Sequence, residues 1–224
     1  MFADFEWANT LNLLGRLFSG ALASLQIFTL TLLFSLPLGL IIALGRMSQN
    51  KWVREPIKLY ILVMRGTPLL LQIIFIYFAP SYMLPQGLSL NLDRFVAAII
   101  AFSLNYAAYF AEIYRGGIES IPRGQYEAAA VLGFTKTQTF MRIILPQVIK
   151  AILPAISNEV ITLVKDTALV QVLGISELFR VAKNESARVF STAPIFIAGL
   201  FYLGMNGLVT KLFHAAEKRL SYYR

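Results

Sequence analysis

Two carboxylates and a hydroxyl recur on one face of an apolar stretch of the chain. Glu159 and Asp166 are seven residues apart, and Thr162 lies between them. Seven residues are close to two helical turns, so the three side chains share a helix face over about 10 Å of its axis. Such a stripe suits a cationic ligand, because carboxylates bind guanidinium and ammonium groups through strong charge-assisted hydrogen bonds.

The same carboxylates also allow a structural role. An ionisable group inside a membrane span costs at least about 2.5 kcal/mol on insertion scales, and such groups commonly pair with one another. Glu159 could pair with Lys165, with Arg65 or with a residue across a dimer interface. Under that alternative the ligand would be neutral or acidic.

A second polar feature, the sequence Arg65-Gly66-Thr67-Pro68, interrupts another apolar stretch. Its glycine and proline should break the helix and free backbone groups, and broken helices line substrate sites in transporters. Arg65 could attract a substrate carboxylate, or it could snorkel or pair with Glu112, and we favour this structural role. Three further polar residues could line the same cavity: Thr67, Asn105 and Asn158.

Composition indicates that these residues lie in membrane spans. Of the 224 residues, 57% are hydrophobic and 14% are charged, whereas soluble domains carry about 25% charged residues. We expect an all-α integral membrane protein with about five transmembrane helices, each long enough to cross about 30 Å of hydrocarbon. The expected spans are residues 21–45, 57–79, 95–113, 151–173 and 192–213.

The remaining segments are shorter. Residues 1–20 carry apolar side chains at helical spacing and predict an amphipathic helix on the membrane surface. The membrane domain should cover residues 21–218, and residues 219–224 should form a C-terminal tail. If Lys58 and Lys211 at the edges of the second and fifth spans are included, the segments after the first, third and fifth spans hold four, five and four Lys or Arg residues, thirteen of the twenty in the chain. The positive-inside rule therefore predicts an outside N-terminus and an inside C-terminus.

Other classes of site are disfavoured by composition. The chain has no cysteine and a single histidine, His214, so we expect no metal site, no catalytic residues and no enzyme activity. The net charge of +8 could suggest a nucleic-acid partner, but the positive residues flank apolar runs instead of forming one soluble patch. No nucleic-acid partner is expected.

A polar, basic island covers residues 125–146. Within it, Glu127-Ala128-Ala129 is followed after three residues by Gly133, and nine residues later come Ile143 and then Leu145-Pro146. We expect two short cytoplasmic helices here, with the alanines leaving one face flat for a partner's groove. Gly133 should end the first helix, and Pro146 should end the second and begin the next span. The alternative is an ordinary loop between spans.

This spacing resembles the EAA loop, E-A-A-x3-G-x9-I-x-L-P, of the permease subunits of ABC importers, and every fixed position matches. The resemblance implies that residues 116–146 form a coupling loop that docks onto a separate ATP-binding subunit. The residues that it assigns to this contact are Glu127, Ala128, Ala129, Gly133 and Phe134.

Three more stretches resemble the polar amino-acid branch of these permeases: residues 65–68, residues 112–127 and the KDTAL sequence at 165–169. The resemblance implies a second permease copy or homologue, two ATP-binding subunits, an extracytoplasmic solute-binding protein and an amino-acid substrate. It implies a multi-pass protein in the bilayer of a bacterial inner or plasma membrane. ATP and Mg would bind the partner ATPase, because this chain has no G-x-x-x-x-G-K-[ST] phosphate loop and no expected cofactor.

The residues and the resemblance together favour an importer of basic amino acids, namely arginine, lysine or histidine. Asp166 would take the common α-ammonium group, and Glu159 would select a cationic side chain. The first alternative is an importer of the same family for glutamine, glutamate or another polar amino acid. A further alternative is an ATP-independent secondary transporter or channel, and ATP dependence of uptake would separate it from the importers.

Overall fold

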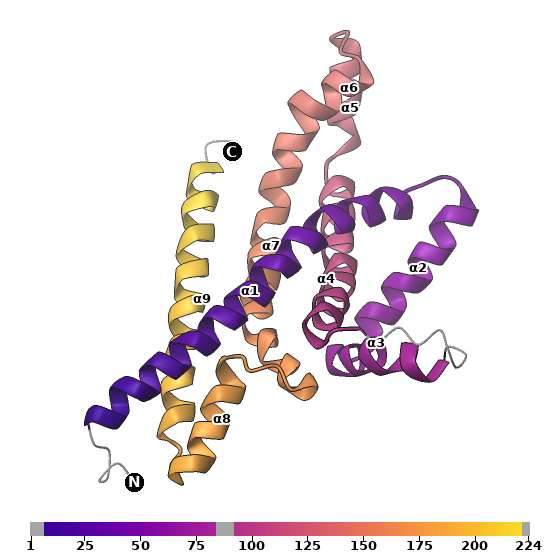
Figure 1. Cartoon of the computed structure of the whole chain (residues 1–224). Coiled ribbons are helices and arrows are strands. Elements are labelled where there is room, and N and C mark those ends of the chain that lie inside the picture. The colour runs from indigo at the N-terminus through magenta and orange to yellow at the C-terminus, as the bar shows by residue number, and fades with distance from the viewer. Residues whose placement is uncertain (1–6, 84–91, 221–224) are drawn as a thin grey trace.

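The fold was analysed in a computed structural model, which describes residues 7–83 and 92–220. The described residues form an elongated bundle of helices (Figure 1). The helices are α1 (Trp7–Arg46), α2 (Lys51–Gly66), α3 (Leu69–Met83), α4 (Arg94–Glu119), α5 (Arg123–Val131), α6 (Lys136–Thr139), the π-helix η1 (Phe140–Ile144), α7 (Leu145–Asp166), the 3-10 helix η2 (Thr167–Leu173), α8 (Leu178–Val189) and α9 (Ala193–Leu220).

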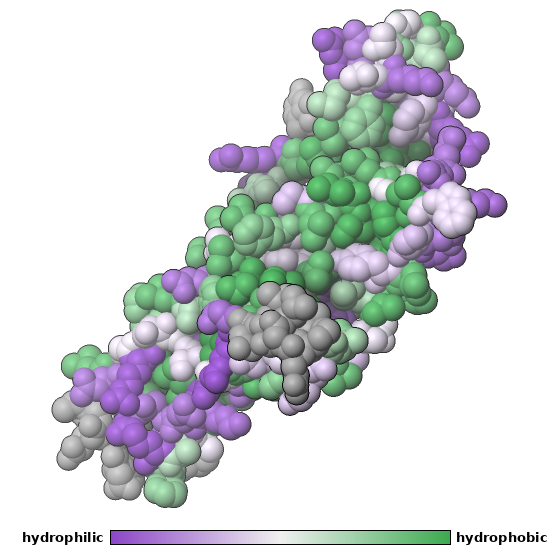
Figure 2. Space-filling model, turned by 45° about the vertical axis from the view of Figure 1, so that its right-hand side comes forward, coloured by the Kyte–Doolittle hydropathy of each residue, from purple (hydrophilic) through white to green (hydrophobic). Residues whose placement is uncertain are grey.

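The lengths of these helices agree with the expected number of spans. Four helical stretches are long and apolar enough to cross a membrane, and the pair α2–α3 makes a fifth if it counts as one span. This pair is bent by 112° at the predicted Arg65–Pro68 break. Apolar side chains gather over the middle of the molecule, and hydrophilic side chains gather toward its two ends (Figure 2).

The N-terminal region differs from our expectation of a separate surface helix. A single helix, α1, continues from Trp7 through the whole first span. One side of its first half packs onto protein, because Leu13 and Leu17 are buried against Leu178 and Ala198, whereas Leu11 and Phe18 on another side are exposed. At the other end of the chain, α9 runs to Leu220, beyond the expected end of the fifth span at residue 213. Residues 1–6 of the predicted N-terminal segment and residues 221–224 of the predicted C-terminal tail lie outside the described residues.

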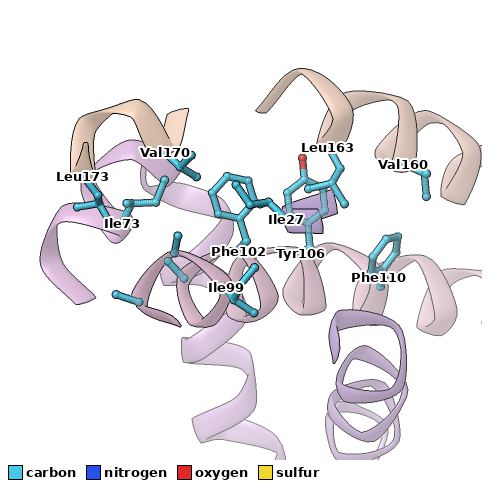
Figure 3. Close-up of a cluster of buried hydrophobic side chains, with 13 residues drawn as sticks. Ile27, Ile73, Ile99, Phe102, Tyr106, Phe110, Val160, Leu163, Val170 and Leu173 are labelled. Atoms are coloured by element: carbon cyan, nitrogen blue, oxygen red, sulfur yellow. The ribbon is translucent and has the colours of Figure 1, made fainter. Parts of the chain in front are cut away.

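Helix α4 is the centre of the main core, which also includes side chains from α1, α3, α7 and η2 (Figure 3). Its buried face is rich in alanine, so α1 can approach its backbone closely. A Cβ atom on Gly39 would lie 2.9 Å from the Phe110 Cβ and 3.1 Å from the Ala107 carbonyl oxygen. Glycine at this position therefore permits the tight crossing of α1 and α4.

A buried carboxylate begins α8 on the side of the bundle opposite α5. Glu177 is fully buried and accepts hydrogen bonds from the backbone N–H groups of Phe179 and Arg180 and from the Tyr202 hydroxyl. Burial raises the pKa of the Glu177 carboxyl, while these three donors act to lower it. The backbone N–H of Leu178 donates to Ser24 of α1, so this corner joins α1, α8 and α9.

A second carboxylate joins the N-terminal part of α1 to α8. Glu185 is 5% exposed and accepts charge-assisted hydrogen bonds from Arg16 at 2.6 Å and from Arg188 at 2.9 Å. Burial acts to raise the pKa of Glu185, but the hydrogen bonds from Arg188 and Arg16 outweigh it and hold the pKa below the usual value.

We predict that Glu185→Gln lowers the melting temperature of the purified protein at pH 7 by about 2–4 °C, because solvent screening of the exposed arginines limits the loss to about 1 kcal/mol. The lowered pKa means that this stabilisation is present above the ordinary glutamate pKa of about 4.3 and is lost as the pH falls through the folded-state value. Melting curves at a series of pH values should show the two proteins converging on the acid side. A constant difference down to low pH would contradict this assignment.

Candidate functional site

The bend between α2 and α3 faces α4 and α7 across a polar cavity of about 430 Å³. The cavity contains both carboxylates that the sequence analysis singled out, and none of its lining residues is basic. It is lined by Thr67, Pro68, Leu69, Asn105, Tyr106, Tyr109, Glu159, Thr162, Asp166 and Leu169. The predicted shared helix face of Glu159, Thr162 and Asp166 is therefore present.

The two carboxylates have different surroundings. Asp166 is the last residue of α7 and accepts a 2.7 Å hydrogen bond from the Tyr106 hydroxyl. This hydroxyl points from α4 toward α7 (Figure 3). Glu159 forms no ion pair within the described residues, so the pairing with Lys165 or Arg65 that we considered is absent from this chain by itself. Glu159 is thus the more available of the two acceptors.

The polar groups freed by the α2–α3 break are satisfied from inside the protein. The Gln72 side-chain amide donates to the backbone oxygens of Met64 and Thr67 and to the Thr67 hydroxyl, at 2.8–3.2 Å. Asn105 donates to the Met64 oxygen at 3.0 Å and to the Gln72 amide oxygen at 2.9 Å. Water is scarce within a membrane, so such internal partners are what make a broken helix tolerable.

This network changes the interpretation of two predicted ligand residues. Asn105 lines the cavity, but both of its amide hydrogens are used at the break. The Thr67 hydroxyl donates to the Val63 oxygen at 2.8 Å and accepts from Gln72. Asn105 and Thr67 therefore shape the cavity wall, and their donor hydrogens are not directed at a ligand.

Arg65 lies beside the cavity and not among its lining residues. One of its Nη atoms is 3.9 Å from a Glu112 carboxylate oxygen, which is the pairing that the sequence analysis favoured. Its guanidinium carbon lies 5.3 Å from the ring centroid of Tyr109, close enough for a cation–π contact. The positive charge of Arg65 also attracts Glu159 electrostatically.

Asn158 is a second predicted site residue that does not line the cavity. It is exposed and absent from the cavity lining, because neighbouring residues on a helix point about 100° apart. Its backbone oxygen accepts a hydrogen bond from the Thr162 hydroxyl.

Sequence reasoning missed Gln72 and the role of Tyr106. Gln72 lies one turn after Pro68 in an apolar helix, and an isolated amide next to a break is a signal that could have identified it. The Tyr106–Asp166 contact joins residues 60 positions apart, and local spacing carries no signal for it.

The EAA-type motif forms the tip of the bundle at the end of α4. Helix α5 ends in a Schellman motif: the Phe134 N–H donates to the Ala129 oxygen, and the Gly133 N–H donates to the Ala130 oxygen. Gly133 has φ +79°, which confirms that this position needs glycine. Ala129 is buried, whereas Glu127, Ala128 and the adjacent Val131 and Leu132 are exposed.

The expected second short helix does not end at Pro146. Helix α6 begins with a Thr135–Gln138 capping box and continues through η1 directly into α7. Proline lacks an N–H group and cannot bond to the Arg142 oxygen four residues earlier. The chain accommodates this loss by a wider turn, in which the Leu145 N–H reaches the Phe140 oxygen, so the helix is deformed but not interrupted.

A bundle of membrane spans, a polar cavity at a broken helix and a small-residue helix at one tip together define the transmembrane subunit of a transporter. The family model of the binding-protein-dependent transport system inner membrane component matches residues 35–222. The arginine transport system permease protein ArtQ of Bacillus subtilis (strain 168) is 36% identical over 221 residues, which cover 97% of this chain and 98% of that protein.

Two further comparisons agree. The L-cystine transport system permease protein TcyB of Bacillus subtilis (strain 168) is 38% identical, over 91% of this chain and 86% of that protein. A crystal structure of an amino acid ABC transporter with histidines superposes with a TM-score of 0.86 at 34% identity, covering 96% of this chain and 99% of that one. The chain therefore belongs to the family of binding-protein-dependent transport system inner membrane components, and its relatives place it among the amino-acid permeases of ABC importers.

Proposed function

We propose that the chain is the membrane subunit of an ATP-driven importer for basic amino acids. The observation that carries the proposal is the polar cavity, which places Glu159 and Asp166 on one wall without a basic residue in the lining. Two carboxylates without a lining cation favour a ligand with two positive groups, an α-ammonium and a charged side chain. The additional side-chain carboxylate of glutamate would be repelled by the same wall.

The roles of the two carboxylates follow from their surroundings. Asp166 is held by Tyr106 and belongs to the KDTAL stretch, so it suits the ammonium group that all amino acids share. Glu159 lacks a partner among the described residues and suits the guanidinium, ammonium or imidazolium of the side chain. Similarity to an arginine permease supports this assignment.

A second candidate is an importer of neutral polar amino acids. Arg65 favours this candidate, because its guanidinium lies over Tyr109 beside the cavity and attracts Glu159. The positive charge of Arg65 therefore offsets part of the negative charge at the cavity. Similarity to a cystine permease supports it as well. Asp166 would then bind the ammonium group, and Glu159 would be structural.

The transport cycle proposed here requires partners outside this chain. Two ATP-binding subunits would take part, one docking at α5 of each permease. Val131 and Leu132 are exposed beside the EAA-type residues and would belong to this contact surface. A second permease and an extracytoplasmic solute-binding protein would complete the assembly. The positive-inside distribution supports a cytoplasmic α5 and C-terminus and an N-terminus outside.

A substrate panel tests the proposal. The chain with its ATPase subunit, reconstituted in nanodiscs, should bind labelled arginine, and unlabelled arginine or lysine should compete more strongly than glutamine or glutamate. Uptake into proteoliposomes should require ATP, and the ATP should be needed only on the side of the membrane where α5 lies. Equal competition by glutamine would support the second candidate, and uptake without ATP would contradict both importer functions.

We predict that Gly133→Ala impairs coupling without impairing insertion. A side chain at φ +79° costs about 1 kcal/mol or more, although nothing lies within 4 Å of the added Cβ. The expected result is about a fivefold loss of ATP-dependent uptake with an unchanged amount of protein in the membrane. Gly124→Ala is the matched control, because it also adds Cβ to open space on α5 and has no positive φ. Equal uptake by the two variants would count against a special role of the Gly133 turn.

A further inference from the structure

A second cavity, separate from the polar cavity, lies between α1, α2 and α4. It has a volume of about 340 Å³ and shares no lining residue with the polar cavity. Arg46 comes from the end of α1, Lys58 and Arg65 come from α2, and Glu112 comes from α4. We call it the basic cavity, because three cations face a single carboxylate.

The carboxylate of the basic cavity is already occupied by another cation. The Arg115 guanidinium donates hydrogen bonds to both Glu112 carboxylate oxygens, with nitrogen–oxygen distances of 2.6 and 3.1 Å. Arg46 and Arg65 approach Glu112 only to 3.9 Å, too far for a hydrogen bond. Lys58 forms no ion pair with any residue in the described part of the chain. The lining of the basic cavity therefore has an excess of positive charge and donors for an anion, although Glu55, one turn before Lys58 on α2, attracts Lys58 and Arg46 from outside the lining.

The position of the basic cavity identifies the medium that it faces. Arg46 is the last residue of α1, and Glu112 lies two turns before the end of α4, which leads into α5. The basic cavity thus lies toward the C-terminal ends of α1 and α4, where the headgroups of a surrounding bilayer would be expected. Leu62 in its lining is 67% exposed, and Leu44, close to Arg46 on α1, is 57% exposed. Apolar surface beside cations suits a ligand that has both an acyl chain and an anionic head.

We propose that the basic cavity binds the phosphodiester headgroup of an anionic phospholipid in the leaflet on the α5 side. Arg46 and Lys58 would donate to the phosphate oxygens, and an acyl chain would lie along Leu62. Arg65 lines the basic cavity and also contacts Tyr109, which lines the polar cavity. A headgroup bound in the basic cavity would therefore lie next to Arg65, the residue that connects the two cavities.

Native mass spectrometry of the full chain with its ATPase tests this proposal. The complex is equilibrated in mixed micelles with equal amounts of phosphatidylglycerol and phosphatidylcholine, and the retained lipid is then measured. Wild type should retain phosphatidylglycerol in preference. Lys58→Gln and Arg46→Gln should each reduce its retention about fivefold, as expected for one cation at a lipid phosphate. Lys51→Gln is the matched control, because this exposed lysine begins α2 outside the basic cavity.

Three results would overturn the proposal. Equal retention of the two lipids would show that the site has no preference for an anion. Equal loss in Lys51→Gln would show a diffuse surface attraction, and displacement of the lipid by excess inorganic phosphate would identify a soluble anion site. The melting temperature of the purified complex reports whether each variant is folded. Lys58→Gln decides the outcome if Arg46→Gln is unstable, because Lys58 has no ion pair to lose among the described residues.

Discussion

Glu159→Gln is expected to reduce arginine binding about 100-fold, which corresponds to about 3 kcal/mol for removal of one partner of a desolvated charge pair. The substitution keeps the size of the side chain and its ability to accept one hydrogen bond, but it removes the negative charge that would face the guanidinium. The measurement is equilibrium binding of labelled arginine to the chain with its ATPase in nanodiscs. Glutamine binding in the same variant should change little.

Glu55→Gln provides the control for this experiment. Glu55 is an exposed carboxylate on α2 that pairs with Arg54 and does not line the polar cavity. Its substitution removes the same charge from the chain and should leave arginine binding unchanged. If Glu159→Gln bound arginine as wild type does, Glu159 would have a structural role and the site would be that of a general polar amino-acid permease.

Gln72→Leu is expected to have the largest effect on stability. It removes the donor to the Thr67 backbone oxygen and leaves one Asn105 amide hydrogen without its acceptor. Each buried polar group left unpaired costs about 1–3 kcal/mol, so the melting temperature should fall by about 10 °C. Arginine binding should weaken at the same time, because the same break supplies Thr67, Pro68 and Leu69 to the polar cavity.

Gln26→Leu separates this effect from a general effect of replacing an amide. Gln26 is exposed on α1, and its side chain forms no hydrogen bond within the described residues. The control variant should melt close to wild type and bind arginine normally. A Gln72→Leu protein as stable as the control would show that the Thr67 oxygen finds another donor, such as a buried water molecule.

The sequence by itself determined the features that depend on local spacing. Apolar stretches of span length, the break at residues 65–68 and the shared face of Glu159, Thr162 and Asp166 all follow from helix geometry and from the chemistry of glycine and proline. The need for glycine at residue 133 follows from the left-handed turn that ends α5. The EAA-type spacing, which is also local, was sufficient to indicate the family.

Only the tertiary structure decided which distant groups meet. Asp166 receives its hydrogen bond from Tyr106 and Gln72 receives one from Asn105, 60 and 33 residues away, and helical periodicity does not encode such contacts. The apolar pattern of residues 1–20 does not say whether another part of the chain covers them, and only the tertiary structure showed that Leu13 and Leu17 pack on α8 and α9 while Leu11 and Phe18 stay exposed. Pro146 was an ambiguous signal for the same reason. A proline can end a helix, or the helix can widen by one turn and continue when helical segments before and after the proline are held by tertiary packing.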